Sequence, residues 1–163
     1  MSTITIDELI GAVLVSASAT AQKLDSMQVN LESPGTHGRT LLMVAASEGL
    51  AEVFELLVER GAKVRTTGKW LMTALHEAAS NGHTEIARRL VELGADVNAQ
   101  SVDGVTPLMC AAAWGHKDVV TLLMGSGADV LRVDSIGATA LDIAREKGED
   151  EVAHMLERYK PSA

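Results

Sequence analysis

Apolar residues recur at helical spacing in short segments that glycine and polar residues separate. In the segment 84–93, Ile86, Leu90 and Leu93 follow one another at intervals of four and three residues, which places them on one face of a helix. The preceding segment 75–81 is short and rich in small residues. Glycine follows both segments, and it ends helices because it enters the left-handed conformation without a steric penalty. The pattern therefore predicts a pair of short helices.

This pair of segments repeats along the chain with a fixed period. Two kinds of residue recur at intervals of 33 positions, namely Thr40, Thr73, Thr106 and Thr139, and Gly49, Gly82, Gly115 and Gly148. A threonine just before a helix satisfies free amide groups of its first turn. A unit of this length cannot bury its own apolar stripe, so we expect the units to stack. Leu57, Leu90 and Leu123 would then form one continuous line of core contacts.

A loop connects each helix pair to the next unit. Residues 95–106 leave room for an extended excursion, and the dipeptide Asp103-Gly104 is typical of a hairpin turn. Glycine occupies the same place in two other units, whereas Leu71 replaces it in one. We therefore expect a finger-like hairpin in each unit, and a reshaped finger at Leu71.

The repeated residues carry a resemblance to a known family. The run TALHEAASNGH at 73–83 resembles the T-P-L-H-x-A-A-x-x-G-H core of the ankyrin repeat, and LVELGADVNA at 90–99 resembles its second half. The resemblance covers residues 38–159, and the family's period is also 33 residues. It implies a mainly α-helical solenoid of about five stacked helix-turn-helix units joined by β-hairpin loops. It also implies a concave face between the hairpin fingers and the first helices.

The resemblance divides the chain into repeats. We expect a degenerate N-terminal capping repeat at 1–37, ankyrin repeats at 38–70, 71–103 and 104–136, and a C-terminal capping repeat with a tail at 137–163. In the first unit Thr5 and Glu8 fit a helix-capping pair, but the family glycines are missing. The last unit becomes polar early, as the exposed end of a stack should. The initial Met1 and this polar end favour an intact small protein over a domain of a longer chain.

Composition narrows the classes of partner. The formal net charge of the 163 residues is −8, which argues against binding to nucleic acid or to an anionic membrane. It favours a basic or neutral protein partner, mainly through the association rate. The single cysteine, Cys110, excludes an internal disulfide framework and fits a reducing compartment, so we expect a cytoplasmic or nuclear protein. We expect the unbound chain to be a monomer.

Candidate catalytic and metal-binding residues are few. His76, His83 and His116 fall in adjacent units, but their spacing matches no zinc motif, and the resemblance implies that such histidines bond the turns between units. Cys110 lies beside two alanines and has no evident base, which favours a structural thiol over a nucleophile. No phosphate-binding loop or metalloprotease motif occurs. We therefore expect no enzyme activity, no metal and no cofactor.

Asn98 has two interpretations. With Leu90 and the preceding Asp96-Val97, it resembles an asparagine that an oxygen-sensing dioxygenase hydroxylates in some ankyrin proteins. Alternatively, its side chain holds the loop in place through hydrogen bonds, a role that is widespread in the family. The sequence leaves both open.

The resemblance implies a non-catalytic protein–protein interaction module, such as a scaffold, that binds its partner through the concave face and the fingers. The alternative is a dedicated inhibitor or regulatory subunit that occludes the active site of an enzyme. In this family, variable residues on the fingers and at the ends of the first helices contact partners. In the middle units these are Lys69, Trp70, Met72, Asn81, Val102, Asp103, Val105, Met109, Ala113 and Trp114. In the outer units they include Thr36, Arg39, Ser47, Glu48 and Ile136.

Both tryptophans of the chain belong to this set. Exposed tryptophan is unusual except at interfaces, where it is enriched among the residues that dominate affinity. We expect an apolar patch across the two middle units, formed by Trp70, Met72, Val102, Val105, Met109 and Trp114. The alternative is that Trp114 packs between helices and Trp70 covers a neighbouring hairpin.

Overall fold

The computed structural model describes residues 6–25, 29–35 and 37–159. Thr5 and Thr36, which the sequence suggested as a helix cap and a contact residue, lie outside these ranges. The described residues form ten α-helices, α1 (Ile6–Val13), α2 (Ala17–Asp25), α3 (Leu41–Ser47), α4 (Ala51–Glu59), α5 (Ala74–Ser80), α6 (Thr84–Glu92), α7 (Pro107–Ala113), α8 (Lys117–Gly125), α9 (Ala140–Lys147) and α10 (Asp150–Arg158). A short 3-10 turn, η1 (Lys69–Leu71), precedes α5.

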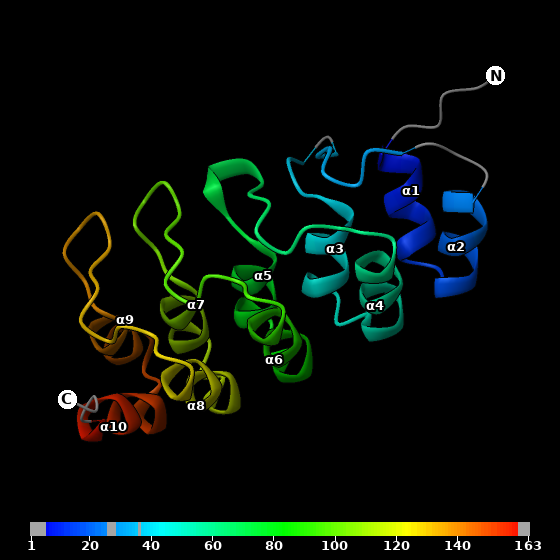
Figure 1. Ribbon diagram of the computed structural model, residues 1–163. Helices are drawn as coiled ribbons and strands as arrows, with labels where there is room; N and C mark the ends of the chain where they lie inside the picture. The colour runs from blue at the N-terminus through cyan, green and yellow to red at the C-terminus, as the bar shows by residue number, and fades with distance from the viewer. Residues whose placement is uncertain (1–5, 26–28, 36, 160–163) are drawn as a thin grey trace.

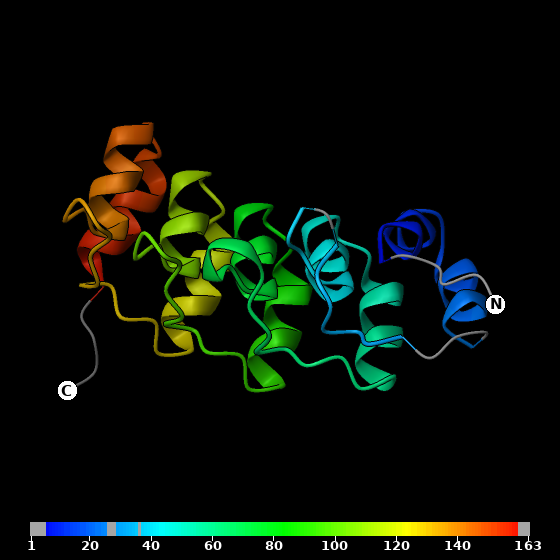
Figure 2. The same ribbon diagram turned by 90° about the horizontal axis from the view of Figure 1, so that it is seen from above.

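The helices stand in pairs, side by side along a row (Figure 1). Helices α3, α5, α7 and α9 pack against one another in one line, and α4, α6, α8 and α10 form a second line. The loops before α3, α5, α7 and α9 project to the same side of the row, and seen from above the row is gently curved (Figure 2). The predicted helical solenoid is thus confirmed.

Two details differ from the expected pattern. The degenerate first unit, with its missing glycines, still forms a helix pair, because α1 packs on α3 and α2 packs on α4. The loops are hairpin-like but contain no β-strand within the described residues, where the one pairing is an isolated bridge between Thr67 and Thr73. Each loop is closed by too few backbone hydrogen bonds to extend into a ladder.

Threonine begins each first helix from α3 onward. Its side-chain oxygen accepts a hydrogen bond from the amide three residues later, and this holds for Thr40, Thr73, Thr106 and Thr139. In the last three, the side chain of that later residue also bonds the amide of the threonine, so the cap is reciprocal. The predicted caps are confirmed.

The core runs the length of the stack. Leu57, Leu90 and Leu123 are each fully buried, at the same place in three successive units. The alanine pair Ala78-Ala79 is also fully buried, so α5 presents little bulk to its neighbours and the units approach closely. Burying apolar surface in this way contributes roughly 25 cal/mol per Å².

Histidines tie neighbouring units together. The Nε2 of His83 donates to the carbonyl of Ser47 over 2.9 Å, and the Nε2 of His116 donates to the carbonyl of Ser80 over 3.0 Å. Each ring lies against the glycine that follows the first helix of the preceding unit. These histidines therefore have the structural role that the resemblance implied.

Glu149 occupies the corresponding place in the last unit and provides a stability test. Its backbone angles (φ −85°, ψ 67°) are close to those of His116 (φ −78°, ψ 75°). An ionised carboxylate only accepts hydrogen bonds, so it cannot donate to the Ala113 carbonyl as histidine would. We expect Glu149→His to raise the free energy of unfolding in urea by about 0.5–1.5 kcal/mol. The reciprocal His116→Glu change should lower it, and a destabilised Glu149→His variant would contradict the role given to these histidines.

Candidate functional site

The loops form a comb of hydrogen-bonded fingers. Each finger is closed by an amide donating to a carbonyl four residues later. The closing pairs are Gly35 and Arg39 in finger 1 (2.9 Å), Gly68 and Met72 in finger 2 (2.8 Å), Ser101 and Val105 in finger 3 (2.9 Å), and Asp134 and Ala138 in finger 4 (3.0 Å). Neighbouring fingers are also joined, by amide-to-carbonyl bonds from Lys69 to Gly38 (2.7 Å), Val102 to Trp70 (2.8 Å) and Ser135 to Asp103 (2.8 Å). The comb therefore holds its exposed side chains in a fixed order.

Finger 2 has a different turn from the other fingers. Where the others place glycine, Leu71 adopts φ 59°, and its neighbour Trp70 adopts φ 64°. The turn is closed one residue later than elsewhere, by the amide of Met72 donating to the carbonyl of Lys69 over 3.3 Å. Two successive left-handed residues match a turn that normally contains Asn-Gly, and each non-glycine residue costs roughly 1–2 kcal/mol there. The reshaped finger predicted from Leu71 is confirmed.

The strain in finger 2 leads to a second stability prediction. Glycine at position 71 removes one steric penalty but adds flexibility to the unfolded chain, which offsets part of the gain. We expect Leu71→Gly to raise the free energy of unfolding by about 0.5–1 kcal/mol. Thermal and urea denaturation would measure this change. The matched Gly104→Leu variant should be destabilised, and equal stability of all three proteins would show that finger 2 is unstrained.

Most of the predicted contact residues lie on the surface. The exposed fractions of Trp70, Val102 and Trp114 are 61%, 59% and 67%. Neither tryptophan is therefore packed away inside the protein, although contact with a partner stays a prediction. Lys69, Asn81 and Asp103 are also exposed, whereas Met72, Val105 and Ala113 are half-buried.

Met109 was wrongly placed in the exposed patch. Its side chain is only 1% exposed, and its sulfur accepts a hydrogen bond from the amide of Thr106 over 3.4 Å. It lies 33 residues after His76, which is also fully buried and likewise caps its helix through Thr73. The period alone would have assigned Met109 to this buried capping position. The predicted apolar patch therefore loses Met109. It keeps the exposed Trp70, Val102 and Trp114 and the half-buried Met72 and Val105.

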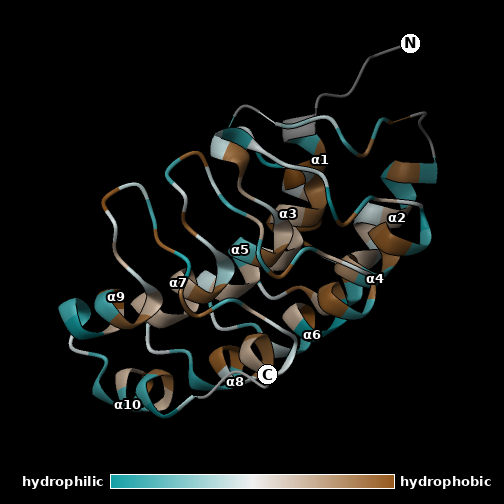
Figure 3. Ribbon diagram, turned by 60° about the vertical axis from the view of Figure 1, so that its left-hand side comes forward, coloured by the Kyte–Doolittle hydropathy of each residue, from teal (hydrophilic) through white to brown (hydrophobic). Residues whose placement is uncertain are grey.

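Hydrophobic residues extend along the fingertips. Figure 3 shows hydrophobic (brown) residues at the tips of the fingers before α7 and α9. Ile136 of finger 4 is 83% exposed, as its place in the contact set predicts. Leu131, in the turn before finger 4, is 73% exposed and was absent from the predicted contact set. Exposed apolar residues grouped on one face are a feature of interaction surfaces.

A polar cluster lies beneath the fingers, at the junction of α3 and α5. Arg39 Nη1 donates to Ser47 Oγ over 3.3 Å and lies 3.9 Å from the Glu77 carboxylate. Asn81 Nδ2 donates to the carbonyl of Glu77 over 3.0 Å and reaches Ser47 Oγ at 3.4 Å. We call Arg39, Ser47, Glu77 and Asn81 the polar cluster. Glu77 was absent from the predicted contact set.

Burial alters the titration of groups in this region. It raises the pKa of the Glu77 carboxyl above its usual range, although the charge of Arg39 and a hydrogen bond from Ser47 act in the opposite direction. It also raises the pKa of the Cys110 thiol, with a hydrogen bond to Ser80 only partly opposing the effect. A buried thiol with a raised pKa is a poor nucleophile, so the burial of Cys110 supports a structural role.

An open hollow adjoins the cluster where α5 and α7 end. It has a volume of about 420 Å³ and is lined by Ser80, Asn81, Trp114 and His116. Trp114 follows the last residue of α7 and caps that helix through its backbone amide. Polar groups at the helix ends therefore line one part of the hollow, and the indole of Trp114 lines another.

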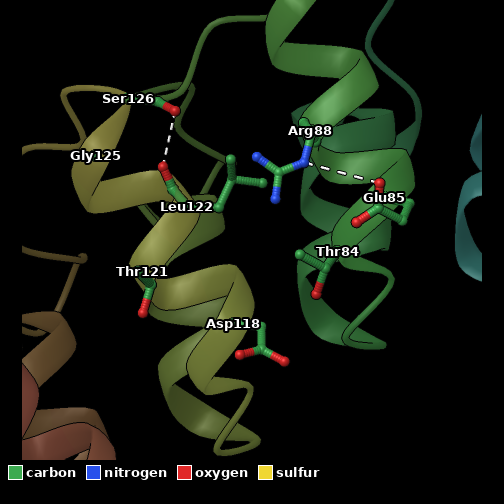
Figure 4. A pocket seen from close by; sticks show the side chains of 8 residues that line it. All are labelled: Thr84, Glu85, Arg88, Asp118, Thr121, Leu122, Gly125 and Ser126. Carbon is green, nitrogen blue, oxygen red and sulfur yellow. Dashed lines mark hydrogen bonds and ion pairs between the residues drawn. The ribbon is translucent and has the colours of Figure 1, made fainter.

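A larger hollow of about 640 Å³ lies between α6 and α8, on the second line of helices (Figure 4). Arg88 forms an ion pair with Glu85 of its own helix at 3.8 Å, and Ser126 donates to the carbonyl of Leu122 over 2.8 Å. Its lining contains Thr and Ser hydroxyls but neither histidine nor cysteine. The Ser126 hydroxyl is engaged with a backbone carbonyl of its own helix, and the one charge pair among the lining residues lies within α6.

Asn98 bonds the following unit in two ways. Its Nδ2 donates to the carbonyl of Gly127 over 3.1 Å, and its Oδ1 accepts from the amide of Asp129 over 2.8 Å. These bonds support the structural interpretation, while hydroxylation stays a prediction. Within the part of the chain that the structure describes, no group of three or more His, Cys, Asp or Glu residues is arranged to hold a metal ion. No described helix is long and apolar enough to cross a membrane.

Comparison with known proteins agrees with the repeat geometry. The family model for ankyrin repeats (3 copies) matches the chain over residues 9–101, 42–134 and 99–161, so nearly the whole stack is covered. A search of curated proteins found no match. Ankyrin repeats are in general non-catalytic protein–protein interaction modules. The matched residues, the recurrent threonine caps and the hydrogen-bonded fingers together establish that this chain belongs to the ankyrin-repeat family.

Proposed function

We propose that this chain binds a protein partner through its concave face and does so without catalysing a reaction. The concave face is defined as fingers 1–4 and the exposed ends of α3, α5, α7 and α9. The observation that carries the proposal is the pair of exposed tryptophans, Trp70 and Trp114, at 61% and 67%. Tryptophan is seldom so exposed except at interfaces, and it is among the residues enriched at binding hot spots.

The rigidity of the comb supports the same proposal. The bonds between adjacent fingers, such as Val102 to Trp70, limit their motion before a partner arrives. Groups ordered in advance lose less entropy on binding, so more of the contact energy appears as affinity. The reshaped turn of finger 2 also fixes the position of the exposed Trp70. Local backbone strain of this kind is a common feature of binding sites.

Affinity purification with matched variants tests this proposal. The bait proteins are the unaltered chain, the Trp70→Ala/Trp114→Ala double variant, and an Arg88→Ala/Thr121→Ala control on the second line of helices. We expect a partner that is retained by the unaltered chain and by the control, and lost from the tryptophan variant, while all three baits keep the same melting temperature. A partner retained equally by all three, or lost only from the control, would contradict the proposed surface.

The inhibitor role uses the same surface and differs in its consequence. If the captured partner is an enzyme whose activity falls in proportion to the bound chain, the chain acts as a regulatory subunit; unchanged activity indicates a scaffold. We also propose a monomeric, cytoplasmic or nuclear protein. Light scattering of the purified chain and imaging of the tagged chain in cells test these two points.

A further inference from the structure

A charged residue occupies a position in α5 that the other first helices fill with apolar side chains. Counting 33 residues from Glu77 in either direction gives Val44 in α3 and Cys110 in α7, and a further step gives Ile143 in α9. Val44 and Cys110 are buried, at 2% and 8% exposed. A carboxylate at such a position costs desolvation energy unless it has a partner charge.

The compensation of Glu77 within the chain is incomplete. Its side chain is only 16% exposed, and the ion pair with Arg39 is long, at 3.9 Å, with an Arg39 side chain that is 36% exposed. Exposed long pairs contribute little to stability. Glu48, which follows α3, adds a repulsive charge, and although a hydrogen bond from Ser47 opposes the effect, burial leaves the pKa of Glu77 raised. A cation from outside the chain would therefore add to the compensation of this carboxylate.

The exposed indole of Trp114 lies beside the polar cluster on the same surface. Asn81, whose Nδ2 donates to the backbone carbonyl of Glu77 over 3.0 Å, lines one hollow together with Trp114. Trp70 already has a cation over its ring, with Lys69 Nζ at 4.9 Å from the centroid. No such cation lies over Trp114 within the described residues. An indole face attracts a guanidinium or ammonium group, and arginine in particular.

We propose that the concave face from the junction of α3 and α5 to the end of α7 is a recognition subsite for a basic side chain of the partner protein, with Glu77 supplying the opposing charge and Trp114 the flanking indole. The partner segment is thus one that presents arginine or lysine, in keeping with the net charge of −8. This inference rests on the proposed function, since it assumes that the concave face binds a protein. Arg39 acts as a competing cation from within the chain, which the entering side chain displaces from Glu77.

Selection from a displayed library of random dodecapeptides on the full chain tests the subsite. We expect the selected peptides to be enriched in arginine or lysine, and their affinity to fall at least tenfold in Glu77→Gln and in Trp114→Ala. The control Glu85→Gln, on the second line of helices, should leave affinity unchanged. Arg39→Gln should strengthen binding severalfold, an effect that a merely structural role for Glu77 would not produce.

The outcomes separate the subsite from the general function. Peptides that lack basic residues, bind Glu77→Gln as well as the unaltered chain and still lose affinity in Trp114→Ala would overturn the basic subsite and leave the concave face as the binding surface. Peptides unaffected by Trp114→Ala as well would contradict both. Far-ultraviolet circular dichroism and melting curves of each variant confirm that a lost interaction does not reflect unfolding.

Discussion

Replacing Leu90 by alanine is expected to lower the free energy of unfolding by about 2–5 kcal/mol. The Leu90 side chain is fully buried on α6, in the middle of the stack, where α6 packs against α5, α4 and α8. Truncation removes apolar contacts and leaves a cavity that the surrounding helices fill only in part. Because each unit is stabilised mainly by its neighbours, a defect in a middle unit weakens the whole array.

Urea denaturation monitored by circular dichroism measures this loss. Leu131→Ala provides the matched control, because the same atoms are removed from a side chain that is 73% exposed. Surface changes of this kind usually alter stability by no more than about 0.5 kcal/mol. A loss below about 1 kcal/mol for Leu90→Ala would contradict the role given to the stacked interfaces.

Replacing Trp114 by alanine is expected to weaken partner binding by about 2 kcal/mol or more, roughly 30-fold in the dissociation constant, with little change in stability. The indole is 67% exposed at the end of α7 and lines the hollow with Ser80 and Asn81. Its removal leaves no cavity inside the protein, because most of the side chain is exposed to solvent. Its apolar surface is available to a partner instead.

Isothermal titration calorimetry with the captured partner, beside a melting curve of each protein, measures the two quantities separately. Ile136→Ala, at the tip of finger 4, is an informative comparison because its side chain is 83% exposed on the same face. We expect a smaller effect there, since isoleucine carries less contact surface than tryptophan. An unchanged affinity together with a sharp fall in melting temperature would assign Trp114 to packing.

The repeat period predicted the fold because each recurrent residue has a local physical role. The threonines at 40, 73, 106 and 139 cap helices, and the predicted bounds of α5 and α6 agree with the structure within one residue at each end. Leu71 was recognised as anomalous for the same reason, since a turn that needs positive φ favours glycine. Such rules act within a few residues and are therefore visible in sequence.

The surface was harder to predict because exposure depends on which side of a short helix a residue occupies. Met109 was assigned to the contact set although it stands at the buried capping position that His76 also fills. Glu77 was omitted because its significance lies in contacts with Arg39 and Ser47, which come from another unit. Contacts between residues of different units depend on how the units stack. The sequence of a single unit does not specify that stacking.

Hydrogen exchange of the chain, free and bound to the captured partner, tests most directly whether the concave face is the binding surface. We expect new protection at the amides of fingers 2 and 3 and at the ends of α5 and α7, with no change in α6 and α8. Protection confined to α6 and α8, with the fingers exchanging as in the free chain, would place the partner on the opposite side and contradict the proposed function.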